Sequence, residues 1–354
     1  MRRNSNHKVN LRDLNLVELK QLMVQLDEKP FRAEQIAGWV FAKGAISFDQ
    51  MTNLSKALRN RLAEVATISK PNILTKQQSK RGDTIKYLFG LVDGHGVESV
   101  LMKHSYGNSA CVSTQVGCRM GCKFCASTME GLVRNLTAAE IYDQVLGIQQ
   151  DTGERVSHIV IMGAGEPLDN YDNVIRFLEN INAPYGLNIS YRHITLSTCG
   201  IVPKIKELAQ IKLPLTLAIS LHAPNNELRN ELVPINRRYP LEELIPACRE
   251  YTEVTGRRIT FEYALLAGVN DGEEQAKELI SLLKGMMSHI NLIPVNPVEG
   301  RGFQRTPPEK VEQFRSILDR AGLNVTIRRE LGTEIDAACG QLRRRYEQVQ
   351  QAKD

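Results

Sequence analysis

The sequence predicts an α/β protein with a partial (βα)6 barrel as its core and a small N-terminal accessory domain of helices and a β-hairpin. From residue 109 onward, short apolar runs alternate with helical segments, a pattern typical of parallel strands joined by right-handed crossovers. Before residue 67, apolar residues recur instead at helix spacing. The predicted core strands are Ser109–Val116, Ser157–Gly163, Tyr191–Thr198, Pro214–Leu221, Arg258–Leu265, Ser288–Pro294 and Asn324–Arg328.

In the first hundred residues the spacing of apolar residues changes once. Three amphipathic helices are expected between Leu11 and Ala66, and after Pro71 the alternation has a period of two. Thr84–Leu91 and Gly96–Met102 therefore predict a hairpin, closed by a Gly-rich turn. The predicted domains are an accessory domain at 1–95 that binds RNA, a core barrel at 96–340 and a basic tail at 341–354.

Local signals mark where the core helices begin. Thr137 and Glu140 have the spacing of a capping box, and Thr306 precedes two prolines and Glu309 in a similar pattern. In complete barrels of this kind the active site lies at the C-terminal ends of the strands. Polar residues that follow predicted strands are therefore the first candidates for a functional site.

Composition limits the class of protein. The chain has 354 residues, 42% of them hydrophobic, with a formal net charge of +5. This mildly basic balance permits a nucleic-acid partner without requiring one. The N-terminus shows no signal peptide and no window is apolar enough to span a membrane, so we expect a cytoplasmic protein without a membrane partner. Seven cysteines, three of them clustered, suit a reducing compartment.

Three cysteines lie within eight residues, at Cys118, Cys122 and Cys125. A structural zinc ion requires four protein ligands, and the fourth could come from Cys111 or His104. A 4Fe–4S cluster is held by one thiolate per iron, so three cysteines leave one iron open to chemistry. The spacing therefore indicates a metal centre and favours a cluster with an open iron over a zinc site.

Polar groups follow several predicted strands. The second core strand ends in a turn with Gly165 and Glu166, where glycine lets a ligand approach the backbone and the carboxylate can accept from an ammonium group. Ser197 ends the third strand, Ser220-Leu221-His222 ends the fourth, and Asn296 follows the sixth. Singly, each suits a helix cap or a turn; together they suggest a polar ligand at the barrel mouth.

Glu98 shares one face of its strand with Val100 and Met102. If this carboxylate is buried, desolvation raises its pKa and makes it a candidate proton acceptor. The alternative is an ordinary solvent-facing strand residue.

Four longer motifs carry a family resemblance. They are Val112–Thr128, Gly131–Thr137, Met162–Tyr171 and Asp336–Leu342. Together they resemble the dual-specificity 23S rRNA and tRNA adenine carbon-2 methyltransferases of the radical S-adenosylmethionine (SAM) superfamily, and the resemblance spans essentially the whole chain. It implies a radical-SAM barrel, an RNA methyltransferase activity and a 4Fe–4S cofactor with two SAM molecules per turnover.

The resemblance also implies residue roles. It assigns the cluster to Cys118, Cys122 and Cys125, the general base to Glu98, the methylated cysteine to Cys339 and its transient disulfide partner to Cys111. Cys199 and Cys248 match no catalytic position and are expected to be structural. The positions implied to contact SAM are Gly165, Glu166, Ser197, Ser220, Leu221, His222 and Asn296.

The implied chemistry explains why the cysteines are needed. Adenine carbon-2 is flanked by two nitrogens and is not nucleophilic. In the implied route one SAM methylates Cys339, a radical from a second SAM activates that methyl group, and the activated carbon bonds to carbon-2. Glu98 removes the carbon-2 proton, and attack by Cys111 releases the RNA as a disulfide forms with Cys339.

Partners and alternatives complete the expectations. The resemblance implies 23S rRNA, tRNA and an electron donor such as flavodoxin or ferredoxin, and Arg119, Lys123 and Arg134 near the cysteines could contact phosphates. Relatives that methylate carbon-8 of the same adenine are the alternative within this class. A non-enzymatic, zinc-stabilised RNA-binding factor is the alternative from another class.

Overall fold

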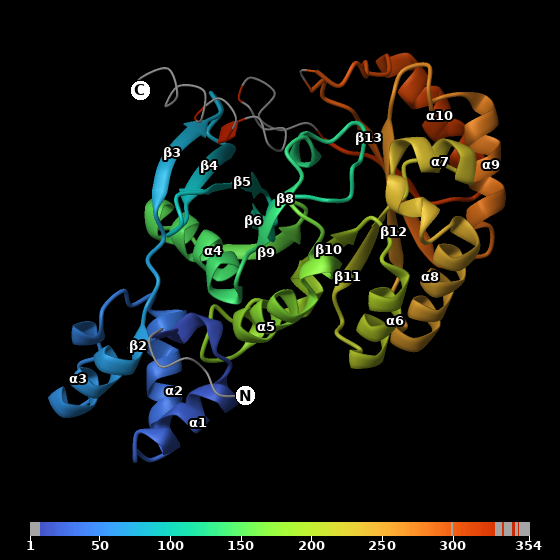
Figure 1. Ribbon diagram of the computed structural model, residues 1–354. Coiled ribbons are helices and arrows are strands. Elements are labelled where there is room, and N and C mark those ends of the chain that lie inside the picture. Colours follow the sequence, from blue (N-terminus) through green and yellow to red (C-terminus); the bar gives the residue numbers. More distant parts are fainter. Residues whose placement is uncertain (1–7, 299, 330–334, 336–341, 344–345, 347–354) are drawn as a thin grey trace.

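The computed structural model describes residues 8–298, 300–329, 335, 342–343 and 346 (Figure 1). Its centre is a curved ten-stranded sheet with helices packed against the outer side (Figure 1). The strands, in spatial order, are β14 (Val325–Ile327), β13 (Ser288–Pro294), β12 (Ile259–Leu265), β11 (Thr216–Ser220), β10 (Ile194–Thr198), β9 (Val156–Ile161), β6 (Gly107–Cys111), β5 (Gly96–His104), β4 (Thr84–Gly90) and β3 (Ile73–Gln78).

The sheet combines a parallel part with an antiparallel extension. Strands β6 and β9 to β14 pair in parallel in that order, with β7 and β8 lying outside this sheet, whereas β3 to β6 pair as antiparallel hairpins. The predicted fold class, a partial (βα)6 barrel, is confirmed. The helices between the parallel strands are α4 (Ala138–Thr152), α5 (Tyr171–Asn182), α6 (Val202–Ile211), α7 (Asn226–Leu232), α8 (Leu241–Thr255), α9 (Glu273–Leu283) and α10 (Pro308–Arg320).

Local sequence signals explain where α4 begins and ends. The Thr137 hydroxyl accepts from the backbone N–H of Glu140 at 3.3 Å, and the Glu140 carboxylate accepts from the backbone N–H of Thr137 at 3.0 Å. This is the predicted capping box. Gly153 ends the helix at φ +68°, a left-handed conformation that favours glycine.

A helical unit precedes the sheet and lies at the lower left of Figure 1. Its helices are α1 (Leu16–Gln25), α2 (Arg32–Ala37) and α3 (Lys56–Val65), and the short strands β1 (Val9–Asn10) and β2 (Ala66–Thr67) pair where the chain enters and leaves it.

One fully buried arginine docks this unit on α4. Arg12 donates to the carbonyl oxygens of Val40 and Ala45 inside the unit, at 2.9 and 2.7 Å, and to Asp143 of α4 at 2.6 Å. Because both charges are buried, the pair holds only while the two surfaces stay together.

The predicted hairpin belongs to the sheet. Strands β4 and β5 pair with each other from Thr84 to Met102, and β5 pairs onward with β6. The boundary that we predicted at residue 95 falls in the turn between them, so it would divide two neighbouring strands of one sheet.

The first core strand differs from the predicted Ser109–Val116. It is divided into β6 and β7 (Gln115–Gly117), and β7 pairs antiparallel with β8 (Leu132–Asn135). The division occurs because the backbone N–H groups of Thr114 and Gln115 both donate to the carbonyl oxygen of Ala164, in the loop after β9. The chain thereby turns from the sheet toward the three clustered cysteines.

The helices of the described residues are short. The longest, α4 and α8, each have 15 residues, and within the described ranges no helix is both long enough and apolar enough to cross a bilayer.

Candidate active site

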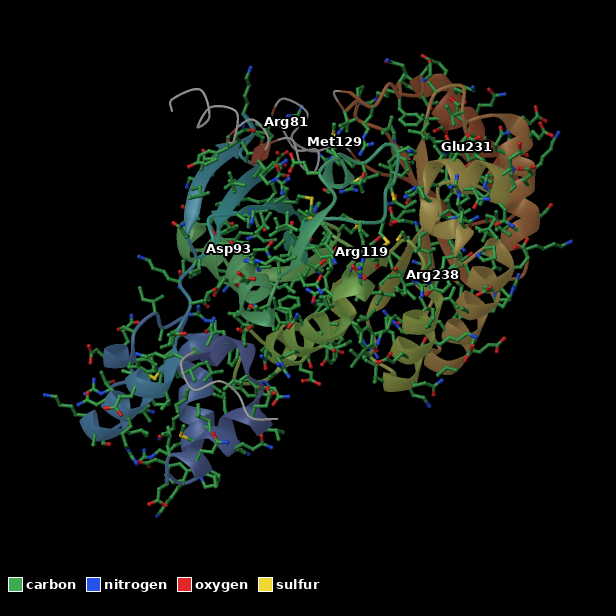
Figure 2. The ribbon with its side chains drawn as sticks, in the orientation of Figure 1. Arg81, Asp93, Arg119, Met129, Glu231 and Arg238 are labelled. Carbon is green, nitrogen blue, oxygen red and sulfur yellow. The ribbon has the colours of Figure 1, made fainter. Side chains whose placement is uncertain are left out.

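A cavity of about 370 Å³ opens at the C-terminal ends of the parallel strands. Its walls come from β4, β5 and β6 on one side and from β10 to β13 on the other, with the cysteine loop between them. Arg119 and Met129, on the segment that carries the cysteines, lie between these two halves of the sheet in the view of Figure 2. The predicted site residues in the wall are Cys111, Cys118, Cys122, Cys125, Gly165, Glu166, Ser197, Ser220, His222 and Asn296.

The cysteine loop has a backbone that its sequence dictates. Gly117 adopts φ +76°, and a Cβ atom there would lie 1.9 Å from the carbonyl oxygen of Gly131, so only glycine fits before Cys118. The Thr128 hydroxyl donates to the carbonyl oxygens of Cys122 and Cys125 at 2.9 and 3.0 Å. These contacts fold the loop into a tight turn.

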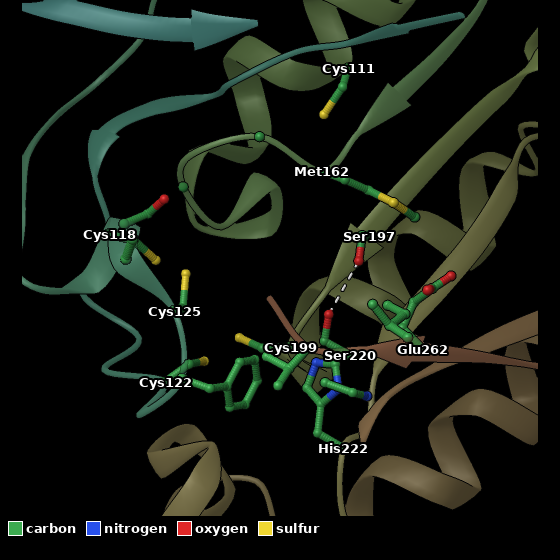
Figure 3. Close-up of a pocket in the computed structure, with 18 of the residues that line it drawn as sticks. Cys111, Cys118, Cys122, Cys125, Met162, Ser197, Cys199, Ser220, His222 and Glu262 are labelled. Atoms are coloured by element: carbon green, nitrogen blue, oxygen red, sulfur yellow. Dashed lines mark hydrogen bonds between the residues drawn. The ribbon is translucent and has the colours of Figure 1, made fainter. Parts of the chain in front are cut away.

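The three thiols of the loop point into the same cavity (Figure 3). Burial raises the pKa of Cys118 to about 12 and also raises the pKa of Cys122. Without a nearby cation both thiols are therefore protonated at neutral pH, and bound iron would supply the positive charge that stabilises the thiolates.

The donor set fits a cluster. Within the described ranges, no three His, Cys, Asp or Glu side chains converge to hold a single metal ion. The thiolates of a 4Fe–4S cluster bind different irons, so they need not converge. His104, a possible fourth zinc ligand, stacks on Tyr106 with ring centroids 4.7 Å apart and does not line the cavity.

Glu166 is a carboxylate with a fixed orientation. It is 3% exposed, and its oxygens accept from the backbone N–H groups of Leu168 at 3.0 Å and Cys199 at 2.8 Å. Burial raises the pKa of Glu166, and these hydrogen bonds oppose that rise. Gly165 adopts φ +110°, and a Cβ atom there would lie 2.7 Å from Cβ of Gln115. Only glycine therefore fits in this turn, and Gly165 lines the cavity next to the carboxylate.

His222 is a neutral hydrogen-bond donor. Its Nδ1 accepts from the backbone N–H of Ala264 at 3.0 Å, so its Nε2 carries the ring hydrogen. Burial lowers the pKa of His222 to about 3, and the positive charge of Arg229 adds to this effect. The ring packs edge-on against Phe124, with centroids 4.8 Å apart, which links the fourth strand to the cysteine loop (Figure 3).

Ser197 and Ser220 face each other across neighbouring strands, with their hydroxyl oxygens 3.3 Å apart (Figure 3). Asn296 follows β13 on the same side of the cavity. Leu221 differs from these residues, because its side chain is fully buried in the main core and does not line the cavity. Its backbone N–H donates to the carbonyl oxygen of Glu262 at 3.0 Å.

Two of the three residues predicted to act on the RNA, Cys111 and Glu98, lie at the opposite wall. Cys111 is buried at the end of β6 and lines the large cavity. Glu98 lines a smaller cavity with Ser127 and Arg343, and both cavities share Ala126 and Ser127. Cys339 lies outside the described residues.

The structure adds residues that the sequence reasoning missed. Glu262, on β12, is 4% exposed, lines the large cavity and accepts from the Asn291 amide at 2.9 Å. Its place in an alternating strand could have indicated an inward carboxylate. Cys199, expected to be structural, also lines the cavity. Arg328 and Arg329, whose positive charge is visible in the sequence, also line the cavity.

Comparisons with known proteins identify the family. Residues 9–68 match the ribosomal RNA large subunit methyltransferase N-terminal domain, and residues 112–280 match the radical SAM superfamily. A radical SAM methyltransferase from Sphaerobacter thermophilus superposes with a TM-score of 0.89 at 44% identity, covering 94% of this chain and 98% of that one.

Two curated relatives are similar over nearly their full length. Both are described as a probable dual-specificity RNA methyltransferase RlmN. The protein from Desulforamulus reducens is 71% identical over 347 residues, covering 98% of this chain and 99% of the relative. The protein from Pelotomaculum thermopropionicum is 61% identical, covering 96% and 92%. The chain therefore belongs to the RlmN family of radical SAM methyltransferases.

Proposed function

We propose that this protein methylates carbon-2 of a specific adenine in 23S rRNA and in tRNA. One observation carries the proposal: the three clustered cysteines, the polar strand-end residues and Cys111 line a single cavity. Relatives described as dual-specificity RNA methyltransferases, at up to 71% identity, support the choice of RNA as substrate.

Cofactor binding is assigned to the loop and to the strand ends. Cys118, Cys122 and Cys125 hold a 4Fe–4S cluster, which when bound supplies the electron that cleaves SAM homolytically. The carboxylate of Glu166 accepts from the ammonium group of SAM, and the neutral Nε2–H of His222 donates to an acceptor of the same molecule. The polar groups of Gly165, Ser197, Ser220, Leu221 and Asn296 complete this binding surface, with Leu221 acting through its backbone.

Two SAM molecules are consumed in each turnover. The first gives its methyl group to the thiolate of Cys339 by displacement, because sulfur is nucleophilic and carbon-2 is not. The second yields the radical that removes one hydrogen atom from that methyl group. The resulting carbon radical adds to carbon-2, and the protein and RNA are then joined through Cys339.

Release requires a base and a second thiol. The radical adduct must give up one electron, which the bound cluster would take up, and Glu98 then removes the carbon-2 proton. Cys111 then attacks the sulfur of Cys339, so that a disulfide forms while the sulfur–carbon bond breaks and the freed carbon takes a proton. The disulfide is reduced before the next turnover, and a reductant such as flavodoxin or ferredoxin supplies electrons in the cytoplasm.

Substrate access requires the adenine to leave its stack. Of the three basic residues predicted near the loop, Arg119 is paired with Asp169, and Arg134 is paired with Asp93 and Glu140. Lys123 is exposed. We therefore assign phosphate contacts first to Lys123 and to the exposed Arg328 and Arg329, and expect binding to weaken as salt rises.

Deuterium labelling tests this route directly. Reconstituted protein is incubated with a reductant, 23S rRNA and SAM whose methyl group carries three deuterium atoms. The proposed route removes one deuterium and returns one solvent proton, so the product is 2-methyladenosine with two deuterium atoms. Three retained deuterium atoms indicate direct transfer, and methylation at carbon-8 indicates the alternative within the class. A colourless, zinc-containing protein without methylation indicates an RNA-binding factor.

A further inference from the structure

Lys86, which nothing in the proposed route uses, is the most unusual ionisable residue near the cavity. It lies in the middle of β4, its side chain is fully buried, and its Nζ lies 3.0 Å from a carboxylate oxygen of Glu98. Lysine is almost never fully buried unless it is paired. A charge in this position needs a reason beyond packing, since apolar residues can replace such pairs without loss of stability.

Strand register explains why the two side chains meet. Lys86 lies opposite Val100 and Glu98 lies opposite Leu88, so Lys86 and Glu98 are diagonal neighbours on one face of the β4–β5 hairpin. Thr84 and Val100, two positions away along each strand, line the large cavity. Because alternate residues of a strand point to the same face of the sheet, Lys86 and Glu98 lie on the same face as Thr84 and Val100, beside the cavity that the substrate must enter.

Other groups define the setting of the pair. The second carboxylate oxygen of Glu98 accepts from the backbone N–H of Arg343 at 2.7 Å, and the Arg343 side chain pairs with Glu130. Cys111 lies opposite Val100 on the next strand, and burial raises its pKa, while the positive charges of Arg328 and Lys86 oppose that rise. The carboxylate is thus held from two sides and faces the thiol that completes the reaction.

We propose that Lys86 is a positioning residue that orients the Glu98 carboxylate for removal of the carbon-2 proton. This inference rests on the proposed function, in which Glu98 is the base. In the step itself the proton passes from carbon-2 to a Glu98 oxygen, and the electron pair of the C–H bond stays in the adduct. Each carboxylate oxygen has two acceptor sites, so both contacts leave a site for the proton.

Burial makes the ammonium group necessary. A carboxylate that is 6% exposed is cut off from bulk water, so its orientation depends on the protein groups that contact it. Lys86 supplies the compensating charge without reaching the substrate.

The test follows the covalent protein–RNA adduct and the product over one turnover of the reconstituted enzyme. In Lys86→Met the adduct should form at the normal rate but decay at least about tenfold more slowly, so it accumulates. Glu98→Gln should show the same behaviour more strongly, because the loss of a base slows decay by about 10²–10⁴. Deuterium at carbon-2 should slow the decay further in Lys86→Met than in the unmodified enzyme. Lys86→Arg should restore part of the rate.

Two further variants keep the test decisive. Lys86→Met removes the cation beside a buried carboxylate and can fail to fold, whereas Lys86→Met with Glu98→Gln removes both charges. This double variant should be no slower than Glu98→Gln alone, because the lysine acts through the carboxylate. Lys76→Met, which breaks the Lys76–Asp151 pair of 2.7 Å on the adjacent strand, is the matched control and should behave normally.

Three outcomes would overturn the role of Lys86. The adduct could decay at the normal rate in Lys86→Met, or form more slowly instead of decaying more slowly. The double variant could also decay more slowly than Glu98→Gln, by the product of the two single effects. Absence of any adduct and of 2-methyladenosine in the unmodified enzyme would instead overturn the proposed function.

Discussion

The two walls of the cavity carry different kinds of side chains. The wall from β10 to β13 presents neutral hydrogen-bonding groups such as Ser197, Ser220 and His222. The wall from β4 to β6 carries groups that change charge or form bonds: Cys111, and beside it the Lys86–Glu98 pair. The parallel part of the sheet is thus suited to binding a cofactor, and the antiparallel extension is suited to handling protons and thiols.

This contrast has a physical origin. Parallel strands are buried on both faces, so polar groups are placed only where each strand ends. An antiparallel hairpin sets side chains opposite one another, so a lysine and a glutamate distant in sequence become neighbours. Glu262 is an ionisable group on the cofactor wall, and burial raises its pKa. A protonated Glu262 would be a neutral donor like its neighbours.

The largest effect is expected at the loop between the walls. Cys118→Ala should abolish methylation and reduce bound iron from about four atoms per chain to a small fraction, because the cluster loses one of its three thiolates. Iron content and the visible absorbance of anaerobically prepared protein measure this. Cys248→Ala is the control: this thiol is fully buried in α8, away from the cavity, and its loss should leave the iron content unchanged.

Cys111→Ala should block release of the RNA without changing the binding of SAM. The adduct should form and then persist, because no thiol attacks the sulfur of Cys339, while SAM affinity stays within about twofold. Denaturing gels and mass spectrometry detect the adduct. Isolation of free protein alone from cells expressing this variant would contradict the proposed release step.

Gly165→Ala should weaken the binding of SAM without acting on the residues of β4 to β6. The new Cβ atom would lie 2.7 Å from Cβ of Gln115 at φ +110°, which costs about 1–3 kcal/mol of strain and would displace the turn that carries Glu166. Calorimetry should show weaker SAM binding by tenfold or more. The control is Gly153→Ala, also at a left-handed φ (+68°) but with nothing within 4 Å, which should destabilise without affecting SAM binding.

His222→Asn gives the smallest effect and tests whether the cofactor wall is neutral. Asparagine tolerates the φ of +59° at this position, so mainly the ring is lost. The folded pKa of about 3 lies below the ordinary 6.5, so the unfolded chain binds the extra proton and the native protein loses stability as pH falls below 6.5.

Between pH 7 and pH 5 the free energy of unfolding should fall by about 2 kcal/mol because of His222, and the His222→Asn variant should not show this contribution. Denaturant unfolding at both pH values, with and without the substitution, measures the difference. An equal pH response in both proteins would show that the ring is not buried in its neutral form.

Local signals predicted much of the fold. The capping box at Thr137 and the strand Ser288–Pro294 are confirmed. Predicted strand boundaries were wrong where hydrogen bonds outside the strand's own pattern decide where the strand begins or ends. The strand predicted from Tyr191 begins at Ile194, because the Ser190 side chain accepts from the backbone N–H of Arg192 and caps a 3-10 turn.

The site was harder to predict. The cysteine spacing and the strand ends were visible in the sequence, whereas the pairing of Lys86 with Glu98 depends on hairpin register, and the place of Cys199 in the cavity depends on packing. The domain boundary at residue 95 stays a prediction. Since the N-terminal family match ends at Ile68, we propose that the accessory domain ends near that residue.

Nucleoside analysis of cellular RNA tests the central claim most directly. Mass spectrometry of 23S rRNA and tRNA from cells that lack this protein should show no 2-methyladenosine. Expression of the unmodified chain should restore it in both RNA classes, and the Cys118→Ala variant should not. Undiminished 2-methyladenosine in the deletion strain, or restoration by the variant, would contradict the account.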